Sequence, residues 1–338
     1  MRRKQPRVLL AFDTPYPIPR GYDFREEFKD PDWVTERDVY KALLENGYEV
    51  NLLGIYDDVM PLIDEIRENR PDVVFNLAEV FRDDSRLEKN IAWLLEMLGV
   101  PYTGAPPSNL LVCNNKALSK EILSFHKIKV PEFYTFYRSH KIRLPRRLPI
   151  PLIVKPLADE ASRGICRASI VKDRKALVER IGFIHRRLRR DVIAEEFIEG
   201  RELYISVLGS VRMRVLPPIE MKFGDVPRHQ PHIATYRAKW DTAYRKSRGI
   251  KNVLAGRLPN GLGEKIEEVC KHAYRALGMR CYARFDIRVT RDAEVYIIEA
   301  NANPSLARYE DFAQAAKKAN IPYDRLIRKI VSHAFQVH

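Results

Sequence analysis

The stretch that decides the fold reads Ala283-Arg-Phe-Asp-Ile-Arg-Val289, followed after a short turn by Val295-Tyr-Ile-Ile-Glu-Ala-Asn301. Successive side chains of a strand point to opposite faces, so Arg284 and Asp286 share the face opposite the apolar residues. By the same rule, Glu299 and Asn301 share one face of the second segment. If the two strands pair, these side chains form a single polar patch of two carboxylates, an amide and a guanidinium.

This patch has two interpretations. Carboxylate and amide oxygens are hard ligands suited to Mg²⁺, which keeps waters and substrate phosphates in its coordination shell. An arginine beside them could neutralise negative charge that develops in a transition state. An exposed hairpin face with ordinary ion pairs has the same spacing, so the spacing alone leaves both interpretations open.

Two upstream segments could hold a nucleotide. Leu152-Ile-Val-Lys155-Pro156 places a lysine in an apolar strand, which is costly unless an anion meets the ammonium group. The turn Ser162-Arg163-Gly164 could fold its backbone amides over a phosphate. The acidic stretch 195–202 follows another apolar strand and could present backbone groups to adenine and a carboxylate to ribose. The alternatives are a lysine whose head reaches solvent and a solvated acidic turn.

Hydrophobic patterning predicts an organisation in three parts. The first alternates strands and helices, which predicts βαβ units and a parallel sheet, with strands at 7–12, 49–54 and 72–76 and helices at 34–46, 59–69 and 85–98. The second is a smaller α+β module, with helices at 116–125 and 173–190 and strands at 151–155, 165–171, 192–197 and 203–208. The third has a polar loop at 222–250, helices at 260–277 and 323–335, and strands at 282–289 and 294–300. We expect domains at 1–112, 113–198 and 199–338.

Composition narrows the class of protein. The 338 residues are 45% hydrophobic and 31% charged, which excludes a disordered chain, and the net charge of +14 favours anionic partners. The four cysteines lack zinc-ligand spacing, and we expect reduced packing thiols. No apolar run approaches the ~18 residues of a membrane span, so we expect a cytoplasmic protein without a membrane partner. Neither GxGxxG nor a P-loop is present.

Taken in order, these segments resemble the ATP-grasp fold, specifically the D-alanine–D-alanine ligase family, over residues 72–306. Arg284, Asp286, Glu299, Asn301 and Pro304 follow the family's Arg-x-Asp…Glu-x-Asn-x-x-Pro pattern. Lys155-Pro156 with Ser162 and Gly164 resembles its phosphate-lid pattern. The resemblance implies an α/β and α+β architecture: an N-terminal parallel-sheet domain, a central α+β lid domain, and a C-terminal α+β domain carrying the metal and catalytic site.

The resemblance also implies roles for single residues. ATP would be bound at its phosphates, adenine and ribose by Lys116, Lys155, Ser162, Glu195, Glu196, Ile198 and Glu202. Two Mg²⁺ ions, which Mn²⁺ could replace, would be held by Asp286, Glu299 and Asn301. The catalytic positions would be Lys239 at the γ-phosphate, Arg284 and Ser305 at the oxyanion, and Glu36 at the amine of the first substrate.

The substrate segments depart from the family pattern. Ser305 stands where the family has an oxyanion-hole glycine, and the serine expected to hold the second substrate's carboxylate falls near Glu310, with Arg308 as a candidate substitute. We therefore expect an ATP-dependent carboxylate–amine ligase that forms an amide through an acylphosphate. Its substrates would be an amino acid or small carboxylic acid other than D-alanine.

Two other functions stay open at this point. One is an authentic D-alanine–D-alanine ligase. The other is a basic ATP- or nucleic-acid-binding protein without ligase activity, which the basic stretches at 138–147 and 180–190 favour. We expect small-molecule substrates, no nucleic acid, and a homodimer, because dimers are usual in the family that the chain resembles.

Overall fold

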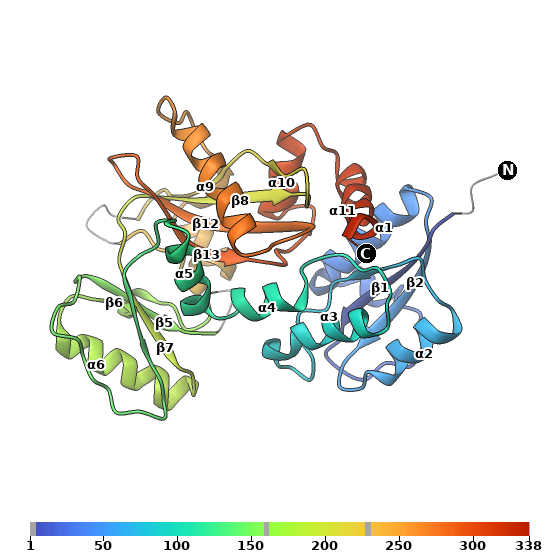
Figure 1. Ribbon diagram of the computed structural model, residues 1–338, viewed down its shortest axis with the longest axis horizontal. Coiled ribbons are helices and arrows are strands. Elements are labelled where there is room, and N and C mark those ends of the chain that lie inside the picture. The colour runs from blue at the N-terminus through green and yellow to red at the C-terminus, as the bar shows by residue number, and fades with distance from the viewer. Residues whose placement is uncertain (1–4, 159–161, 227–230, 338) are drawn as a thin grey trace.

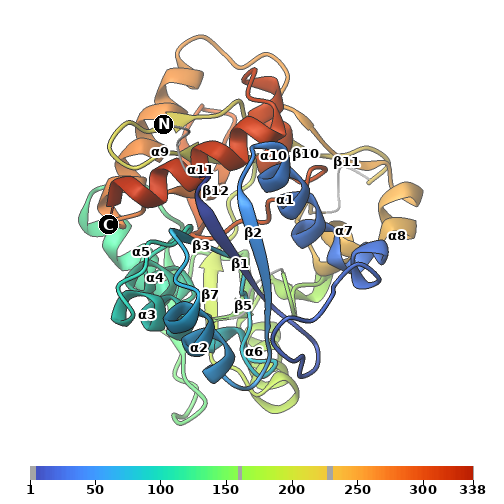
Figure 2. The same ribbon diagram turned by 90° about the vertical axis from the view of Figure 1, so that its right-hand side faces the viewer.

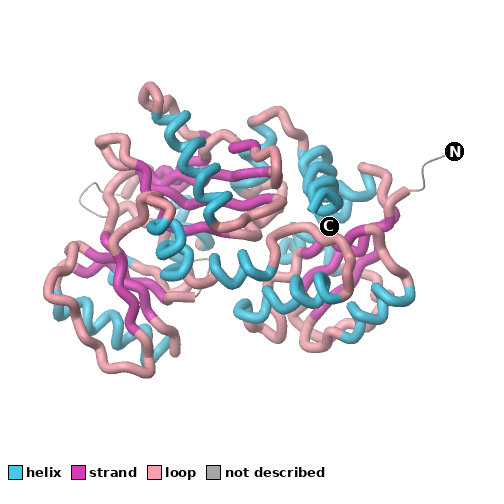
Figure 3. The backbone as a smooth tube through the Cα atoms, viewed as in Figure 1, coloured by secondary structure: helices cyan, strands magenta, loops and turns pink. Residues whose placement is uncertain are grey.

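The computed structural model describes residues 5–158, 162–226 and 231–337, and its strands form three sheets in that part of the chain (Figure 1). Helices cover the faces of these sheets (Figure 3). The helices at Pro107–Cys113 and Lys116–Phe125 lie between the first sheet and the second in the chain, and residues 197–200 join the second sheet to the third. No helix among the described residues has both the length and the apolarity needed to cross a bilayer.

The first sheet is parallel, as the alternating pattern predicts. Its order is β2-β1-β3, with β1 at Arg7–Asp13, β2 at Glu49–Ile55 and β3 at Val73–Asn76. Its residues Val8 to Phe12 are all at most 1% exposed, which explains the continuous apolar run of β1. The helices of this region are α1 (Val34–Glu45), α2 (Met60–Glu68), α3 (Glu88–Met97) and α4 (Pro107–Cys113).

The second sheet is antiparallel and follows α5 (Lys116–Phe125). Its order is β4-β7-β5-β6, with β4 at Phe133–Phe136, β5 at Leu152–Pro156, β6 at Ile170–Val171 and β7 at Val192–Glu196. The expected helix at 173–190 is shorter: α6 spans Arg174–Phe183 and continues as a π-helical turn to Leu188. Arg189 then takes a left-handed conformation (φ 53°), which ends the helix.

The third sheet contains the deciding stretch. Its order is β11-β10-β8-β12-β13, with β9 paired to β8, and the strands are β8 (Arg201–Leu208), β9 (Arg214–Val215), β10 (Ile219–Phe223), β11 (Ile250–Leu254), β12 (Tyr282–Val289) and β13 (Val295–Asn301). Helices α9 (Leu262–Ala276) and α10 (Asp311–Lys318) complete this region.

The expectation of a loop at 222–250 is wrong in part, because the segment contains α7 (Tyr236–Trp240) and α8 (Thr242–Ser247). Side-chain caps start both helices: Thr235 accepts from the Ala238 amide, and Asp241 accepts from the Tyr244 amide. The cysteine expectation is also wrong in part. All four are free thiols, and Cys113, Cys270 and Cys281 are buried, but Cys166 is exposed in the loop before β6.

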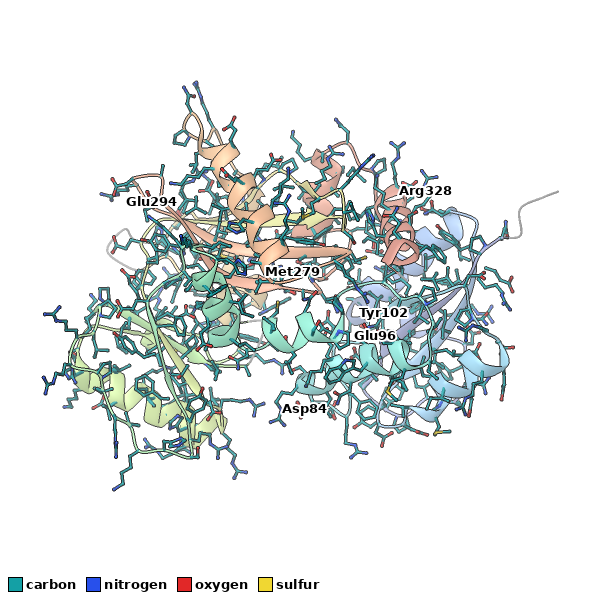
Figure 4. The ribbon with its side chains drawn as sticks, in the orientation of Figure 1. Asp84, Glu96, Tyr102, Met279, Glu294 and Arg328 are labelled. Carbon is teal, nitrogen blue, oxygen red and sulfur yellow. The ribbon has the colours of Figure 1, made fainter. Side chains whose placement is uncertain are left out.

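The last helix, α11 (Tyr323–Val337), packs against α1 and β3 of the first region (Figure 2). Leu326 and Ile330 are fully buried in one cluster with Val8 and Val39. A second hydrophobic cluster contains buried residues of the first and third regions, among them Tyr102 and Met279 (Figure 4). The first and third regions therefore share hydrophobic cores.

Candidate active site

The polar face of the deciding hairpin forms as the alternation predicts. Asp286 lies opposite Glu299 and Arg284 lies opposite Asn301 in the antiparallel ladder of β12 and β13. The guanidinium Nε of Arg284 donates to Asp286 Oδ1 at 2.8 Å. Asp286 is only 4% exposed, and the Arg284 side chain is 15% exposed. The exposed-hairpin interpretation is therefore wrong, because other elements cover this face.

Lysines from two distant elements cover the two carboxylates. Lys116, at the start of α5, places Nζ 3.1 Å from Glu299 Oε1, and Lys239 of α7 places Nζ 3.4 Å from Asp286 Oδ2. Burial opposes the ionisation of Glu299, but Lys116, Lys239 and Lys155 outweigh it and hold the pKa of this carboxyl well below its usual range. Glu299 is therefore an anion at neutral pH.

Lys155 is part of a buried charge triad with Lys120 and Glu195. Lys155 Nζ lies 2.8 Å from Glu195 Oε2, and Lys120 Nζ lies 3.1 Å from Glu195 Oε1. Glu195 is 0%, Lys120 is 1% and Lys155 is 6% exposed, so Lys155 does not extend to solvent. Burial would raise the pKa of Glu195, but Lys120 and Lys155 lower it below the usual value. The anion that meets Lys155 is a side chain of the protein itself.

A narrow cavity lies between the second and third sheets. It holds about 60 Å³ of space, and its apolar walls include Ile153, Phe197 and Ile198. Glu202 lies at one side, where it pairs with Arg288 at 2.5 Å and accepts from the Tyr204 hydroxyl at 3.1 Å. The cavity brings together nine residues singled out from the sequence, namely Lys155, Ser162, Glu195, Glu196, Ile198, Glu202, Lys239, Asp286 and Glu299.

A larger cavity of about 660 Å³ adjoins it and shares Lys239 and Glu299 as lining residues. Arg284, Asn301 and Ser305 also line this larger cavity. Arg308 is not among its lining residues, because its guanidinium stacks on the Tyr323 ring, 4.3 Å from the centroid. The candidate catalytic residues of the C-terminal region therefore face one space.

Glu36 is the predicted site residue that the structure leaves apart. It lies in the first turn of α1 and is not a lining residue of either cavity in the described part of the chain. Its Oε2 is buried without a hydrogen-bond partner among the described residues. Burial, with a smaller contribution from Asp13, raises the pKa of Glu36 to about 7.

Sequence reasoning missed two ionic residues of the site. Lys120 lies four residues after Lys116 on α5, so helical spacing placed both on one face. Arg288 lies two residues after Asp286 on β12, so strand alternation placed it on the polar face. Both signals were readable, but their partners Glu195 and Glu202 come from strands far away in the sequence.

The donor set of Asp286, Glu299 and Asn301 fits Mg²⁺, because it offers two carboxylates and one amide oxygen from adjacent strands. Such a set leaves coordination positions for waters and phosphate oxygens. Among the described residues, no group of three or more His, Cys, Asp or Glu side chains is arranged to hold a metal ion. Asp286, Glu299 and Asn301 therefore suit a site in which phosphate oxygens complete the coordination of the ion better than a structural site made of protein ligands alone.

Comparisons with known proteins identify the family and the fold of the chain. The family model described as "D-ala D-ala ligase C-terminus" matches residues 122–332. A D-alanine–D-alanine ligase from Bordetella petrii is 27% identical over 317 residues, covering 93% of this chain and 90% of that protein. The uncharacterized protein y4sG of Sinorhizobium fredii is 27% identical over 335 residues, covering 97% of this chain and 93% of that protein. The crystal structure of D-alanine–D-alanine ligase from Bacillus anthracis complexed with ATP has a TM-score of 0.74 at 21% identity, covering 98% of each chain.

Proposed function

This chain belongs to the D-alanine–D-alanine ligase family and has its ATP-grasp fold, and from that premise we propose that it joins a carboxylate to an amine with hydrolysis of ATP to ADP and phosphate. The observation that carries the proposal is the shared polar face of β12 and β13, with Lys116 and Lys239 placed on its carboxylates. Cations and carboxylates around one cleft are what a metal-bound triphosphate requires.

The residues that line the narrow cavity suit ATP by their chemistry, and the space of about 60 Å³ would have to widen for the nucleotide to enter. The isoleucines and Phe197 offer apolar walls to a flat base, and Glu202 offers a carboxylate for ribose. Lys155 and Lys116 reach the same region from the second sheet and α5, and Ser162 lines the cavity in a left-handed turn (φ 59°). The relative from Bacillus anthracis was crystallised with ATP, which supports this assignment.

The metal would be held by Asp286, Glu299 and Asn301. Mg²⁺ would neutralise phosphate charge when bound, and we propose that two ions bind there. Glu299 is suited to the role because its lowered pKa keeps it ionised at neutral pH. On binding of the nucleotide, we propose that Lys116 and Lys239 turn from these carboxylates toward phosphate oxygens.

The proposed reaction has two steps, transfer of a phosphoryl group and formation of the amide. An oxygen of the substrate carboxylate attacks the γ-phosphorus of ATP, the bond to the bridging oxygen breaks, and ADP leaves with that electron pair. The amine then attacks the carbonyl carbon of the acylphosphate, a proton is lost from nitrogen, and inorganic phosphate leaves. Lys239 stabilises the transferred phosphoryl group, while Arg284 and Ser305 stabilise the negative charge on the carbonyl oxygen.

We propose that α7 and α8 shield the intermediate from water. Trp240 and Thr242 of these helices line the larger cavity beside Lys239. An acylphosphate hydrolyses in water, so a closed site favours amide formation over loss of phosphate. Ser305 and Glu310 in the substrate cavity favour a substrate pair other than two D-alanines. We also propose that the protein is cytoplasmic and forms a homodimer, and sedimentation of the purified chain would test the dimer.

A product screen tests the function. The full chain is incubated with ATP, Mg²⁺ and pools of amino acids and small carboxylic acids, and mass spectrometry detects any condensation product. ADP release that depends on two substrates is the expected result. Absence of every amide product, with ADP release unchanged by added substrates, would contradict a ligase. Formation of D-alanyl-D-alanine as the only product would instead contradict the proposal that the substrates differ from two D-alanines.

A further inference from the structure

Arg288 is a buried cation that lines the narrow cavity. It lies two residues after Asp286 on β12, so both side chains leave the same face of the sheet, about 7 Å apart along the strand. Arg288 is 6% exposed and lies directly opposite Glu202 in the antiparallel ladder of β12 and β8. A buried guanidinium is costly unless acceptors surround it, so the partners of Arg288 indicate what the fold uses it for.

The guanidinium of Arg288 connects three elements around the narrow cavity. It pairs with Glu202 at the start of β8. Its terminal nitrogens also donate to the carbonyl oxygens of Gly200, at 3.0 Å, and His232, at 2.7 Å. His232 comes directly before two residues that line the cavity, Ile233 and Ala234. The orientation of Glu202 and the position of this cavity wall therefore depend on the same side chain.

The Glu202 carboxylate keeps capacity for a ligand. Arg288 donates to its Oε2, and the Tyr204 hydroxyl donates to its Oε1 at 3.1 Å. Burial, and after it the charge of Glu202, raises the pKa of Tyr204 well above its usual value, so this hydroxyl keeps its proton. Each carboxylate oxygen accepts about two hydrogen bonds, so among the described residues one acceptor position stays open on each oxygen. Two neighbouring hydroxyl groups, as on a ribose ring, match this pair of positions.

We infer that Arg288 is a positioning residue, which fixes Glu202 so that its two oxygens accept the 2′ and 3′ hydroxyl groups of the ribose of ATP. The inference rests on the proposed function, which places the nucleotide in this cavity. Arg288 acts through Glu202, because its own donors are directed at Glu202 and at two backbone carbonyls. Held on both oxygens, Glu202 presents its open positions in one orientation before the nucleotide arrives. The chain should therefore distinguish ribose from deoxyribose.

Binding of matched nucleotides tests the inference without turnover. Titration calorimetry of the full chain with Mg²⁺ compares ADP with 2′-deoxy-ADP, which lacks one hydroxyl group. We expect wild type to bind ADP roughly tenfold more tightly, equivalent to about 1.4 kcal/mol. R288M keeps a long unbranched side chain but removes the guanidinium, and it should lower this affinity ratio to roughly twofold. R291M is the matched control, because Arg291 is exposed in the turn after β12 and lines neither cavity, and it should keep the wild-type ratio.

A double-mutant cycle with E202Q tests whether Arg288 acts through Glu202. E202Q alone should lower the affinity ratio, and adding R288M to E202Q should lower it no further. Its control is E268Q, which removes an exposed carboxylate of α9 outside both cavities and should keep the ratio. A purely structural role of Arg288 would weaken the binding of both nucleotides equally and leave their ratio unchanged.

R288K covers the case in which circular dichroism shows that R288M does not fold. A lysine keeps a cation beside Glu202, but its single ammonium group cannot replace the planar fork that reaches three acceptors. The affinity ratio of R288K should therefore lie between those of wild type and E202Q. With R288M unfolded, an R288K ratio equal to that of wild type overturns the inference.

The outcomes separate the inference from the ligase function. A wild-type ratio near one, an R288M ratio equal to that of wild type, or a further fall when R288M is added to E202Q overturns the inference. An amide product in the screen leaves the ligase function standing in each of these cases. A ratio that depends on both Arg288 and Glu202, in a chain that makes no amide, supports the inference and contradicts the ligase. If neither nucleotide binds to wild type, the inference is overturned and the product screen alone decides the function.

Discussion

Replacing Glu195 with glutamine should be one of the most damaging isosteric changes in the chain. E195Q keeps the shape of the side chain, so no cavity forms, but two ammonium groups at 2.8 and 3.1 Å lose their counter-charge. All three residues are at most 6% exposed, so water cannot replace the lost partner. Breaking a buried ion pair from one side costs about 3–5 kcal/mol, which for a chain of this size lowers Tm by about 5 °C.

Thermal unfolding at pH 7.5, followed by circular dichroism, measures this effect. E196Q is the matched control, because Glu196 is the next residue along β7 and is only half-buried, so its Tm should change by less than about 1 °C. The double variant E195Q/K120M should recover part of the loss, since it removes one of the two unpaired cations. ATP should also bind more weakly to E195Q, because Glu195 orients Lys155.

The pH dependence follows from the lowered pKa of Glu195. A carboxyl whose pKa falls on folding stabilises the native state above its unfolded value near 4.5, and this stabilisation disappears as pH falls through the lowered value. The Tm gap between wild type and E195Q should therefore stay constant from pH 7 to 5 and shrink below pH 4. A Tm for E195Q within about 1 °C of wild type at pH 7.5 would refute the reasoning.

Three further predictions concern the site and its surroundings. D286A and E299A should each lower kcat roughly 100-fold or more in the ligase assay while E268Q leaves it unchanged, and full activity in either variant would remove these residues from the metal set. Because the pKa of Glu36 is raised to about 7, its ionisation destabilises the folded chain as pH rises from 4.5 to about 7, and the effect levels off above that. The Tm of E36Q should therefore rise relative to that of wild type over this pH range. A Tm difference that stays constant from pH 4 to 8 would contradict the raised pKa. Added salt should lower kcat/KM for ATP more steeply in wild type than in R186Q/R187Q, and at low ionic strength the kcat/KM of wild type should be roughly threefold higher. Equal slopes of kcat/KM against salt would show that this basic face does not steer the nucleotide.

The salt prediction follows from where the charge lies. Residues 113–198 carry 20 Lys and Arg against 9 Asp and Glu, a net +11 of the chain's +14. Arg186, Arg187 and Arg189 are exposed after α6, at the end of the helix that covers the second sheet. If this surface bound nucleic acid instead, retention on DNA or RNA would be strong at low salt and would fall steeply as salt is added.

The part of the site that lies close together in sequence could be predicted. Strand alternation and one tight connection determine which residues of β12 and β13 share a face, and the pairing of Asp286 with Glu299 confirms it. The parallel first sheet could also be predicted, because a strand buried on both faces must be a continuous apolar run. The domain limits 1–112, 113–198 and 199–338 and the roles of the single site residues stay predictions.

What could not be predicted depends on contacts between distant segments. Strands β4 and β10 are short, and neither is apolar enough to be recognised alone. Strand β4 pairs with β7, more than 50 residues further along the chain, and β10 pairs with β8 and β11 on either side of it in the sequence. The partner of Lys155 could not be predicted for the same reason, because it lies in a distant segment. A buried lysine predicts an anion, but only the fold shows that Glu195 supplies the anion and that Lys120 also pairs with it. Short helices such as α7 depend on a single capping hydroxyl within a polar segment.

The packing of α11 on α1 and β3 has a consequence for the synthesis of the protein. The first sheet is translated before the helix that buries Val8, Leu10 and Val39, because α11 follows all three sheets in the chain. Until Leu326 and Ile330 emerge, that apolar surface stays open to water and to chaperones. A chain that stops before Tyr323 would therefore lose the solubility of its N-terminal region, although every candidate catalytic residue would be present.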